Sequence, residues 1–391
     1  MKNGRFLKAL LMVSVWLPVP SAFAQIRPVA LDSFSTNGPL YVLRDDGTIL
    51  RSSTVKGVVN AGSFIKIPSS FTAVDISAST IFNRQELIFV SMNSRNGRVS
   101  EYSGSGDEVA HWDLPEPVWG LDVSPNHTLY VAGVTSRTVY SVSLSGDPRK
   151  DMEKQFAPFA TVGDAANIGP LVSWNEILYV ADTLHGTVYS IGSDRKAKQI
   201  IVGCGQPAAI RARDVSGNGT QVVVADTISR RLLTAVVGPQ TVNAKAFSEP
   251  GLSDPSSITV SARGGFVVAD RGNSSIEEVD ANGKLISRTF LQQQFVTIHG
   301  GGYPDIRGTA QLERSLSNGG FSMNTDNSSN LSATGSYRID YFTKDATVPR
   351  LVQEILAHSL GVDKATIQLN YVGEQFPSNR KDTVGIWLRS K

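Results

Sequence analysis

The chain has 391 residues, of which 37 are basic and 35 acidic, so its formal net charge at pH 7 is +2. This balance excludes electrostatic capture of nucleic acid, which needs a concentrated basic face. Charged residues make up 18% of the chain and glycine occupies 35 positions, a composition typical of a turn-rich all-β protein rather than a helical one.

Residues 1–24 have the pattern of a signal peptide. A basic start is followed by a short apolar core at residues 9–16 and by Ala22-Phe23-Ala24, which fits the small-x-small rule for cleavage. The apolar core is shorter than the ~20 residues that span a bilayer, and no later stretch is long enough either. The sequence predicts a periplasmic or secreted protein that begins at Gln25 and has no transmembrane segment in the mature chain.

A strand phrase recurs through residues 25–298. Its clearest copies are Leu129-Tyr130-Val131-Ala132 and Leu178-Tyr179-Val180-Ala181, and weaker copies occupy residues 40–43, 87–90, 222–225 and 266–269. After each copy a short polar turn leads to a second β-rich run. The period is roughly 42 to 49 residues, close to the length of one four-stranded propeller blade. Repeats of this kind bury their faces by stacking on their neighbours.

We count about six blades from these copies. A seventh blade would have to lie between Arg51 and Ile81, where the pattern is weakest. In a closed ring the N-terminal strand commonly joins the last blade, so we expect Ile26–Leu31 to pair near Leu285–Phe290. Closure removes the exposed sheet edges that would otherwise invite aggregation.

The composition changes after the propeller region. Gly300-Gly301-Gly302 and Pro304 indicate a Gly-rich linker at residues 299–311, and residues 315–335 predict a hairpin or a loose linker. A small β-α-β-β domain is expected at residues 312–391. Its strands are predicted at Tyr337–Phe342, Thr366–Tyr371 and Val384–Leu388. Its helix has Thr347 as N-cap, Gly361 as stop, and an apolar stripe at Val348, Leu351, Val352, Ile355 and Leu356. The fold class is therefore all-β, a propeller of about six blades followed by a small α+β domain.

The repeats resemble NHL and YncE-type β-propellers and, more distantly, the SMP-30/gluconolactonase group. The stretch from Val118 to Ser141 carries the likeness, because it is similar to the lactonase phrase Asn-Gly-x-x-x-Ser-Pro-Asp followed by Leu-Tyr-x-x-Asp. In that group the Asn and the last Asp are metal ligands. Here Trp119 and Ala132-Gly133 occupy those positions and offer no oxygen side chain to a hard cation. The resemblance therefore implies the fold more strongly than the metal-dependent activity.

Five residues are candidates for ligand binding: Trp119, Asp182, His185, Asp226 and Asp270. The three aspartates end successive strand phrases, so they could form an acidic ring. A structural interpretation is favoured, because an Asp at a strand end can accept backbone N–H groups of the following turn. His185 lies in a turn beside Gly186, and an exposed turn residue is the simpler interpretation. Trp119 either packs between blades or faces a partner.

No catalytic or metal-binding motif is present. The five histidines show no metal-ligand spacing, and the chain contains no nucleophile elbow, Walker loop or dinucleotide fingerprint. No cofactor is expected, and an enzyme is the less favoured class. The leading hypothesis is an exported scaffold that binds a protein or a cell-envelope component. The alternative is a metal-dependent, lactonase-like hydrolase or a lyase acting in the central channel.

Overall fold

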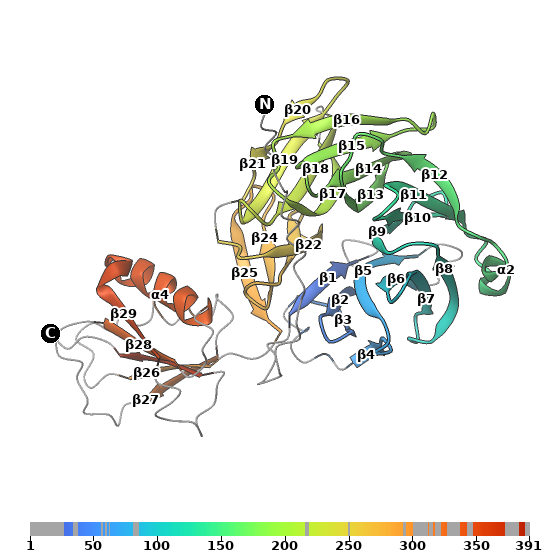
Figure 1. Ribbon diagram of the computed structural model, residues 1–391. Helices are drawn as coiled ribbons and strands as arrows, with labels where there is room; N and C mark the ends of the chain where they lie inside the picture. The colour runs from blue at the N-terminus through green and yellow to red at the C-terminus, as the bar shows by residue number, and fades with distance from the viewer. Residues whose placement is uncertain are drawn as a thin grey trace, which may run out of the picture.

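The computed structural model describes residues 27–33, 38–55, 58, 61, 63–80, 86–215, 219–248, 251–291, 295–299, 312, 316, 322–326, 337–341, 347–371 and 383–387. Residues 1–24, assigned above to the signal peptide, lie outside them. Six antiparallel sheets follow one another in chain order and form the blades of a β-propeller (Figure 1). The predicted propeller of about six blades is confirmed.

Each blade is built from strands that follow one another in the chain, except that β20 pairs with blade 4 and is skipped by blade 5. Blade 1 comprises β1 (Pro28–Asp32), β2 (Leu40–Arg44), β3 (Thr48–Ser52) and β4 (Ser63–Lys66); blade 2 comprises β5 (Thr72–Ser79), β6 (Leu87–Asn93), β7 (Gly97–Ser103) and β8 (Glu108–Leu114). Blade 3 comprises β9 (Val118–Val123), β10 (Thr128–Gly133), β11 (Thr138–Ser143) and β12 (Ala157–Thr161); blade 4 comprises β13 (Ile168–Trp174), β14 (Ile177–Asp182), β15 (Thr187–Ile191) and β16 (Ala197–Val202), with β20 (Val242–Asn243) parallel to β16. Blade 5 comprises β17 (Pro207–Val215), β18 (Gly219–Asp226), β19 (Arg231–Val237) and β21 (Lys245–Ala246); blade 6 comprises β22 (Pro255–Val260), β23 (Phe266–Asp270), β24 (Ser275–Val279) and β25 (Leu285–Phe290).

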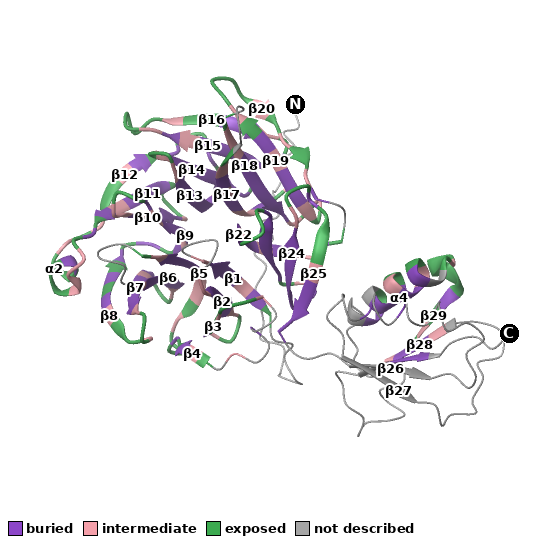
Figure 2. Ribbon diagram, turned by 180° about the vertical axis from the view of Figure 1, so that it is seen from behind, coloured by how far each residue is buried: buried purple, intermediate pink, exposed green. Residues whose placement is uncertain are grey.

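The recurring phrase forms the second strand of each blade. In β14 every residue from Leu178 to Asp182 is buried. A strand in the middle of a blade is covered on both faces by neighbouring blades, so it becomes a continuous apolar run rather than an alternating one. Figure 2 shows this burial along the inner strands and exposure along the outer turns.

Side-chain packing closes the ring between blades 1 and 6. The first strands contact one another in the order β1, β5, β9, β13, β17 and β22, and β22 contacts β1. Leu31 and Val42 of blade 1 belong to the same hydrophobic cluster as Val267 and Ala269 of blade 6. The Ser257 hydroxyl accepts the N–H of Leu31 at 3.1 Å and donates to its carbonyl at 3.2 Å.

The expected pairing of the N-terminal segment with the last blade is wrong. β1 pairs with β2, and β25 pairs with β24. Blade 6 draws all four strands from consecutive chain, so it has no vacant position for an N-terminal strand. The region between Arg51 and Ile81 holds the last strand of blade 1 and the first strand of blade 2 rather than a seventh blade.

The antiparallel strand order gives the propeller two faces. We call one of them the loop face. At this face each first strand begins, each second strand turns into the third, and each fourth strand ends. The opposite face carries the turns between first and second strands and those between third and fourth strands, and we call it the hairpin face. Because β25 ends at the loop face, the chain leaves the propeller from there.

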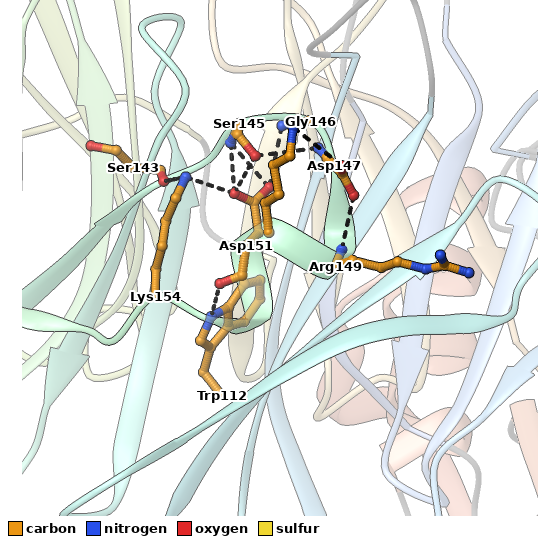
Figure 3. A network of polar contacts seen from close by, with 9 residues as sticks. Trp112, Ser143, Ser145, Gly146, Asp147, Arg149, Asp151 and Lys154 are labelled. Carbon is orange, nitrogen blue, oxygen red and sulfur yellow. Dashed lines mark hydrogen bonds and ion pairs between the residues drawn. The ribbon is translucent and has the colours of Figure 1, made fainter.

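The short helix α2 (Pro148–Met152) lies between β11 and β12 of blade 3 and packs against β8 of blade 2 (Figure 3). The Asp151 carboxylate accepts the Ser145 N–H at 2.7 Å and Nζ of Lys154 at 2.8 Å. Its backbone carbonyl accepts the indole N–H of Trp112, from blade 2, at 3.0 Å. Burial acts to raise the pKa of Asp151, but the hydrogen bonds from Lys154 and Ser145 leave it below its usual value. The ionised carboxylate therefore fixes the helix within blade 3, and the backbone carbonyl of Asp151 links the helix to blade 2.

The C-terminal sheet has the strand order β27-β26-β30-β28-β29. Its elements are β26 (Phe295–His299), β27 (Ser322–Asp326), β28 (Tyr337–Tyr341), α4 (Thr347–Leu360), the 3-10 helix η2 (Lys364–Thr366), β29 (Ile367–Tyr371) and β30 (Thr383–Trp387). Val352 and Leu356 of α4 are buried against Ile339 and Ile386, and Phe290 at the end of blade 6 joins the same cluster. Gly361 follows the helix with a φ of +64°. This conformation suits glycine at a helix C-terminus.

The predicted helix and the three strands of the C-terminal unit are confirmed. Two further strands enlarge the sheet. β26 begins inside the range 25–298 that we had assigned to the propeller, and β27 pairs with it in parallel where a hairpin or loose linker was expected. Parallel pairing between segments far apart in the chain leaves no local turn signature, so composition gave no sign of either strand. The Gly-rich run at residues 300–302 lies outside the described residues.

Candidate functional site

The first strands of the blades contribute equivalent residues to the central channel. The recurring phrase lies in the second strand of each blade, and its second residue pairs with a residue of the first strand. That first-strand residue is Asp32 in blade 1, Asp122 in blade 3 and Arg211 in blade 5. The same register gives Val172 in blade 4 and Thr259 in blade 6. In blade 2 the second position of the phrase, Ile88, pairs with Ala78, and the next residue, Phe89, pairs with Ser77. The hydrogen bonds described below place Ser77 rather than Ala78 in the equivalent position, so the channel ring consists of Asp32, Ser77, Asp122, Val172, Arg211 and Thr259.

Arg211 connects blades that are not neighbours. Its Nη2 forms an ion pair with Oδ1 of Asp32, and its Nη1 lies 3.9 Å from Oδ1 of Asp122. Blade 6 separates Arg211 from Asp32, and blade 4 separates it from Asp122, so both contacts cross the channel. The side chain of Arg211 is only 15% exposed. Buried charges of this kind are tolerated when opposite charges and hydrogen bonds surround them.

The two aspartates of the ring also hold the blade that follows each of them. Oδ2 of Asp32 accepts the N–H of Ala78 at 2.9 Å, and Oδ2 of Asp122 accepts the N–H of Ser173 at 2.7 Å. Ala78 follows Ser77 in the chain just as Ser173 follows Val172, so the two hydrogen bonds are equivalent. This equivalence places Ser77 in the channel ring, and its hydroxyl lies 3.4 Å from Oδ1 of Asp122.

Asp75 adds a third carboxylate beside the ring. Its two oxygens accept the N–H groups of Ile76 at 2.9 Å and of Leu121 at 3.2 Å. Burial raises the pKa of Asp75 to about 7 and the pKa of Asp122 to about 6, and the positive charge of Arg211 offsets only part of this effect. Three carboxyls share one guanidinium, so protons are retained on the cluster near neutral pH.

The cavity beside the cluster is small. Its volume is about 30 Å³, and Trp119, Asp75 and Arg211 are among the residues that line it. That volume accommodates ordered water, whereas small-molecule sites usually measure ~300–1,000 Å³. The channel at this level is therefore filled by side chains rather than open to a substrate.

Trp119, one of the sequence candidates, lies half-buried at this cavity. Its carbonyl accepts the Ser91 hydroxyl at 2.6 Å. A Cβ atom on Gly169 would lie 3.1 Å from the indole ring, so the glycine allows blade 4 to approach that ring closely. Trp119 thus fills space between neighbouring blades and borders the channel.

Asp182, Asp226 and Asp270 are fully buried at the ends of second strands. The hydrogen bonds expected from the structural interpretation are present in all three. Each carboxylate accepts N–H groups from both the segment that enters its blade and the turn that follows. The donors are Ala166, Asn167, Leu184 and His185 for Asp182; Gly205, Gln206, Ile228 and Ser229 for Asp226; and Ser253, Asp254 and Asn273 for Asp270.

These three aspartates differ in their electrostatic surroundings. Burial acts to raise the pKa of Asp182, but its backbone hydrogen bonds hold that pKa below the usual value. In blade 6, burial and the nearby Glu277 raise the pKa of Asp270 to about 7. His185, whose side chain is 55% exposed, places Nδ1 2.9 Å from Oδ2 of Asp182. The carboxylate of each aspartate accepts hydrogen bonds from its own blade and from the segment that enters it. The structure does not bring the three carboxylates together.

In blade 3 a glutamate elsewhere in the chain takes the place of the aspartate that ends the second strand in blades 4 to 6. Gly133 stands where blades 4 to 6 have aspartate, and Oε2 of Glu116 accepts the N–H groups of Thr135 at 2.6 Å and Ser136 at 2.7 Å. A Cβ on Gly133 would lie 2.6 Å from Oε1 of Glu116, so the glycine makes room for the incoming side chain. The turn therefore keeps its carboxylate although the sequence repeat is broken.

The loop face carries two strongly exposed aliphatic side chains on adjacent blades. Leu184, in the β14–β15 turn, is 70% exposed, and Ile228, in the β18–β19 turn, is 69% exposed. The segment that joins blades 4 and 5 lies between the two turns: the N–H of Cys204 donates to the carbonyl of Gly186, and a Cβ on Gly205 would lie 2.7 Å from Cβ of Ile228. The two side chains and this segment form what we call the aliphatic patch.

Within the described part of the chain, no three His, Cys, Asp or Glu side chains are placed to hold a metal ion together. Over the same residues, no helix is long and apolar enough to cross a membrane.

No family model and no curated protein sequence matches the chain. Solved structures do match it. The chain is similar to a protein in the nidogen/laminin complex, with 17% identity, a TM-score of 0.51, and 63% of this chain and 91% of that chain covered. It is also similar to virginiamycin B lyase from Staphylococcus aureus, with 11% identity, a TM-score of 0.50, and coverage of 68% and 85%. At these identities the similarities show the fold alone, and the protein belongs to the β-propeller class.

Sequence reasoning missed the buried cluster. Asp122 and Arg211 each interrupt an apolar run in a first strand, as in Leu121-Asp122-Val123, and Asp32 ends one. A charged residue at one fixed position of an apolar repeat is the signal that could have found them, because burying an unpaired charge is costly.

Proposed function

We propose that this protein is an exported, non-catalytic propeller that binds a protein or a cell-envelope component through the loop face. The observation that carries the proposal is the aliphatic patch, with Leu184 and Ile228 at 70% and 69% exposure on adjacent turns. Aliphatic side chains that remain this exposed on a rigid scaffold favour contact with a partner. The C-terminal unit supports the same assignment, since the chain reaches it from the loop face.

The proposal predicts that the double variant Leu184→Ser/Ile228→Ser loses at least ten-fold in partner capture while its melting temperature is unchanged. Both side chains already contact water, so replacing them removes little buried area from the fold. Capture from envelope extract by the mature chain, followed by affinity measurement on the retained component, tests this. Val236→Ser is the matched control, because Val236 is 46% exposed on the outer part of blade 5. Equal retention by the double variant and the control would refute the assignment.

The alternative function, a hydrolase or lyase acting in the channel, draws support from one observation. Asp75 and Asp122 have raised pKa values of about 7 and about 6 beside a buried arginine. Carboxyls that titrate near neutral pH are suited to general acid–base catalysis.

The two functions are separated by melting the protein with and without millimolar Ca²⁺, Mg²⁺ or Zn²⁺ and by assaying a panel of lactones. A bound metal must raise the melting temperature by mass action. We expect no shift and no turnover. Metal stabilisation or lactone opening that disappears in Asp122→Asn would establish the channel as an active site.

A further inference from the structure

A second cavity opens on the hairpin face between blades 3 and 4, away from the aliphatic patch. Its volume is about 370 Å³, at the lower end of the range of small-molecule sites. Blade 3 contributes the β9–β10 turn and the half-buried rings of Tyr130 and Phe159. Blade 4 contributes Leu178, Ile191 and the β13–β14 turn. We call this cavity the hairpin-face cleft.

The floor of the cleft is aromatic and aliphatic. The rings of Tyr130 and Phe159 meet edge to face with their centroids 5.0 Å apart, and they pack on the buried core between the two blades. The guanidinium of Arg195 lies 5.3 Å from the Phe159 ring centroid. An aromatic face that is partly open to solvent offers an apolar surface with a negative π-cloud, which suits the C–H groups of a flat ligand ring.

The rim of the cleft is polar and exposed. Asn126 uses its Oδ1 to accept the Ser124 hydroxyl, so its amide N–H groups are available to a ligand. Asn175 donates through Nδ2 to Asp214 at 3.0 Å, which leaves its carbonyl oxygen as an acceptor. Glu176 adds a carboxylate on the same turn. Its charge is opposite to that of Arg195, so the two together are neutral.

Tyr130 is partly exposed in the cleft, whereas the equivalent tyrosines of other blades are buried. Tyr130 occupies the same repeat position as Tyr41 in blade 1 and Tyr179 in blade 4, which are 0% and 2% exposed. Blade 1 even has an equivalent aromatic pair, Tyr41 and Phe64, with centroids 5.9 Å apart. Blade 3 therefore differs from its repeats in leaving this tyrosine accessible from a cavity.

From these features we propose that the hairpin-face cleft binds a neutral saccharide of one or two rings. A pyranose has an apolar face of C–H groups and an edge of vicinal hydroxyls, which match the aromatic floor and the amide and carboxylate rim. The site is distinct from the loop face and does not depend on the protein-binding function proposed there.

The test is a glycan array probed with the full mature chain, followed by saturation-transfer NMR and titration of the strongest neutral glycan. We expect one or more neutral glycans to bind, with at least a ten-fold loss of affinity in Phe159→Ala. The exposed rim substitutions Asn126→Ala and Glu176→Gln should each weaken binding several-fold. They provide variants that fold normally even if Phe159→Ala lowers the melting temperature.

Phe64→Ala, which removes the equivalent ring in blade 1, is the matched control and should bind like the wild type, as should Leu184→Ser/Ile228→Ser. The proposal is overturned if no neutral glycan on the array binds the wild-type chain. It is equally overturned if binding survives both the floor and the rim substitutions, or if it is lost only when the aliphatic patch is changed. Selective capture of anionic or cationic glycans would also contradict it.

Discussion

The substitution Arg211→Met is expected to lower the free energy of unfolding by about 3–5 kcal/mol at pH 8, the range observed when one partner of a buried ion pair is removed. It leaves Asp32, Asp75 and Asp122 in the channel without their shared positive charge, while the arginine's hydrophobic volume is largely kept. Chemical denaturation of the variant and the wild type at pH 8 measures the loss. The control is Arg271→Met, whose ion pair with Asp254 is 2.7 Å long but partly exposed to solvent. Its loss should stay below about 1 kcal/mol.

The difference in unfolding free energy between the wild type and Arg211→Met should become smaller as the pH falls. The pKa of Asp75 rises from 3.8 to about 7 on folding, and that of Asp122 rises to about 6. A carboxyl whose pKa is raised binds its proton more tightly in the folded state, so the contribution of these two groups to stability is greatest at low pH and falls as pH rises from about 4 to about 7. At pH 5 these two carboxyls are largely neutral even without Arg211. The variant and the wild type should therefore differ far less at pH 5 than at pH 8.

A second substitution checks the electrostatic cause. Asp122→Asn keeps an oxygen for the Ser173 N–H but removes one negative charge, so in the Arg211→Met background it should restore part of the stability at pH 8. A double-mutant cycle measures the coupling between the two residues, which is the amount by which the stability of the double variant exceeds the sum of the two single-variant effects. If the pH 8 loss persists unchanged at pH 5 and in the double variant, the arginine contributes packing rather than charge compensation.

The fold follows largely from local features of the sequence. The strand phrase ending in Ala181-Asp182 is apolar because its strand is covered on both sides, and the turn after it needs a carboxylate, so the phrase and the aspartate recur together. The C-terminal helix was predictable for a similar reason, since its stripe and the stop at Gly361 are local. Features set within one blade or one helix leave a pattern that can be read from the chain.

Features that depend on contacts across the fold were not predictable in this way. The channel ring combines residues from six blades, and Arg211 meets Asp32 across a separation of 179 residues. Ring closure depends on how Leu31 and Ser257 pack, which no local pattern records. Blade 3 shows the same limit: Gly133 breaks the repeat, and only the structure reveals that Glu116 supplies the missing carboxylate.

The substitution Asp182→Ala is expected to cost about 3 kcal/mol or more at pH 7, because it leaves four backbone N–H groups without their acceptor. The donors are Ala166, Asn167, Leu184 and His185, and a buried unsatisfied donor typically costs about 1–3 kcal/mol before water enters. The control is Asp194→Ala, since that exposed aspartate accepts the Lys196 N–H at 3.1 Å and its loss should cost well under 1 kcal/mol.

The pH dependence of the Asp182 variant should run opposite to that of the channel cluster. The pKa of Asp182 is lowered on folding, so its stabilisation is complete above the unfolded value of 3.8 and is lost as pH falls through the folded pKa. The wild type should therefore lose this contribution below about pH 4, and Asp182→Ala should show a correspondingly weaker acid dependence. Hydrogen exchange would locate the effect, because the N–H groups of Leu184 and His185 should lose protection while those in blade 1 keep theirs. Unchanged exchange at that turn would mean that the carboxylate does not hold blade 4 to its entering segment.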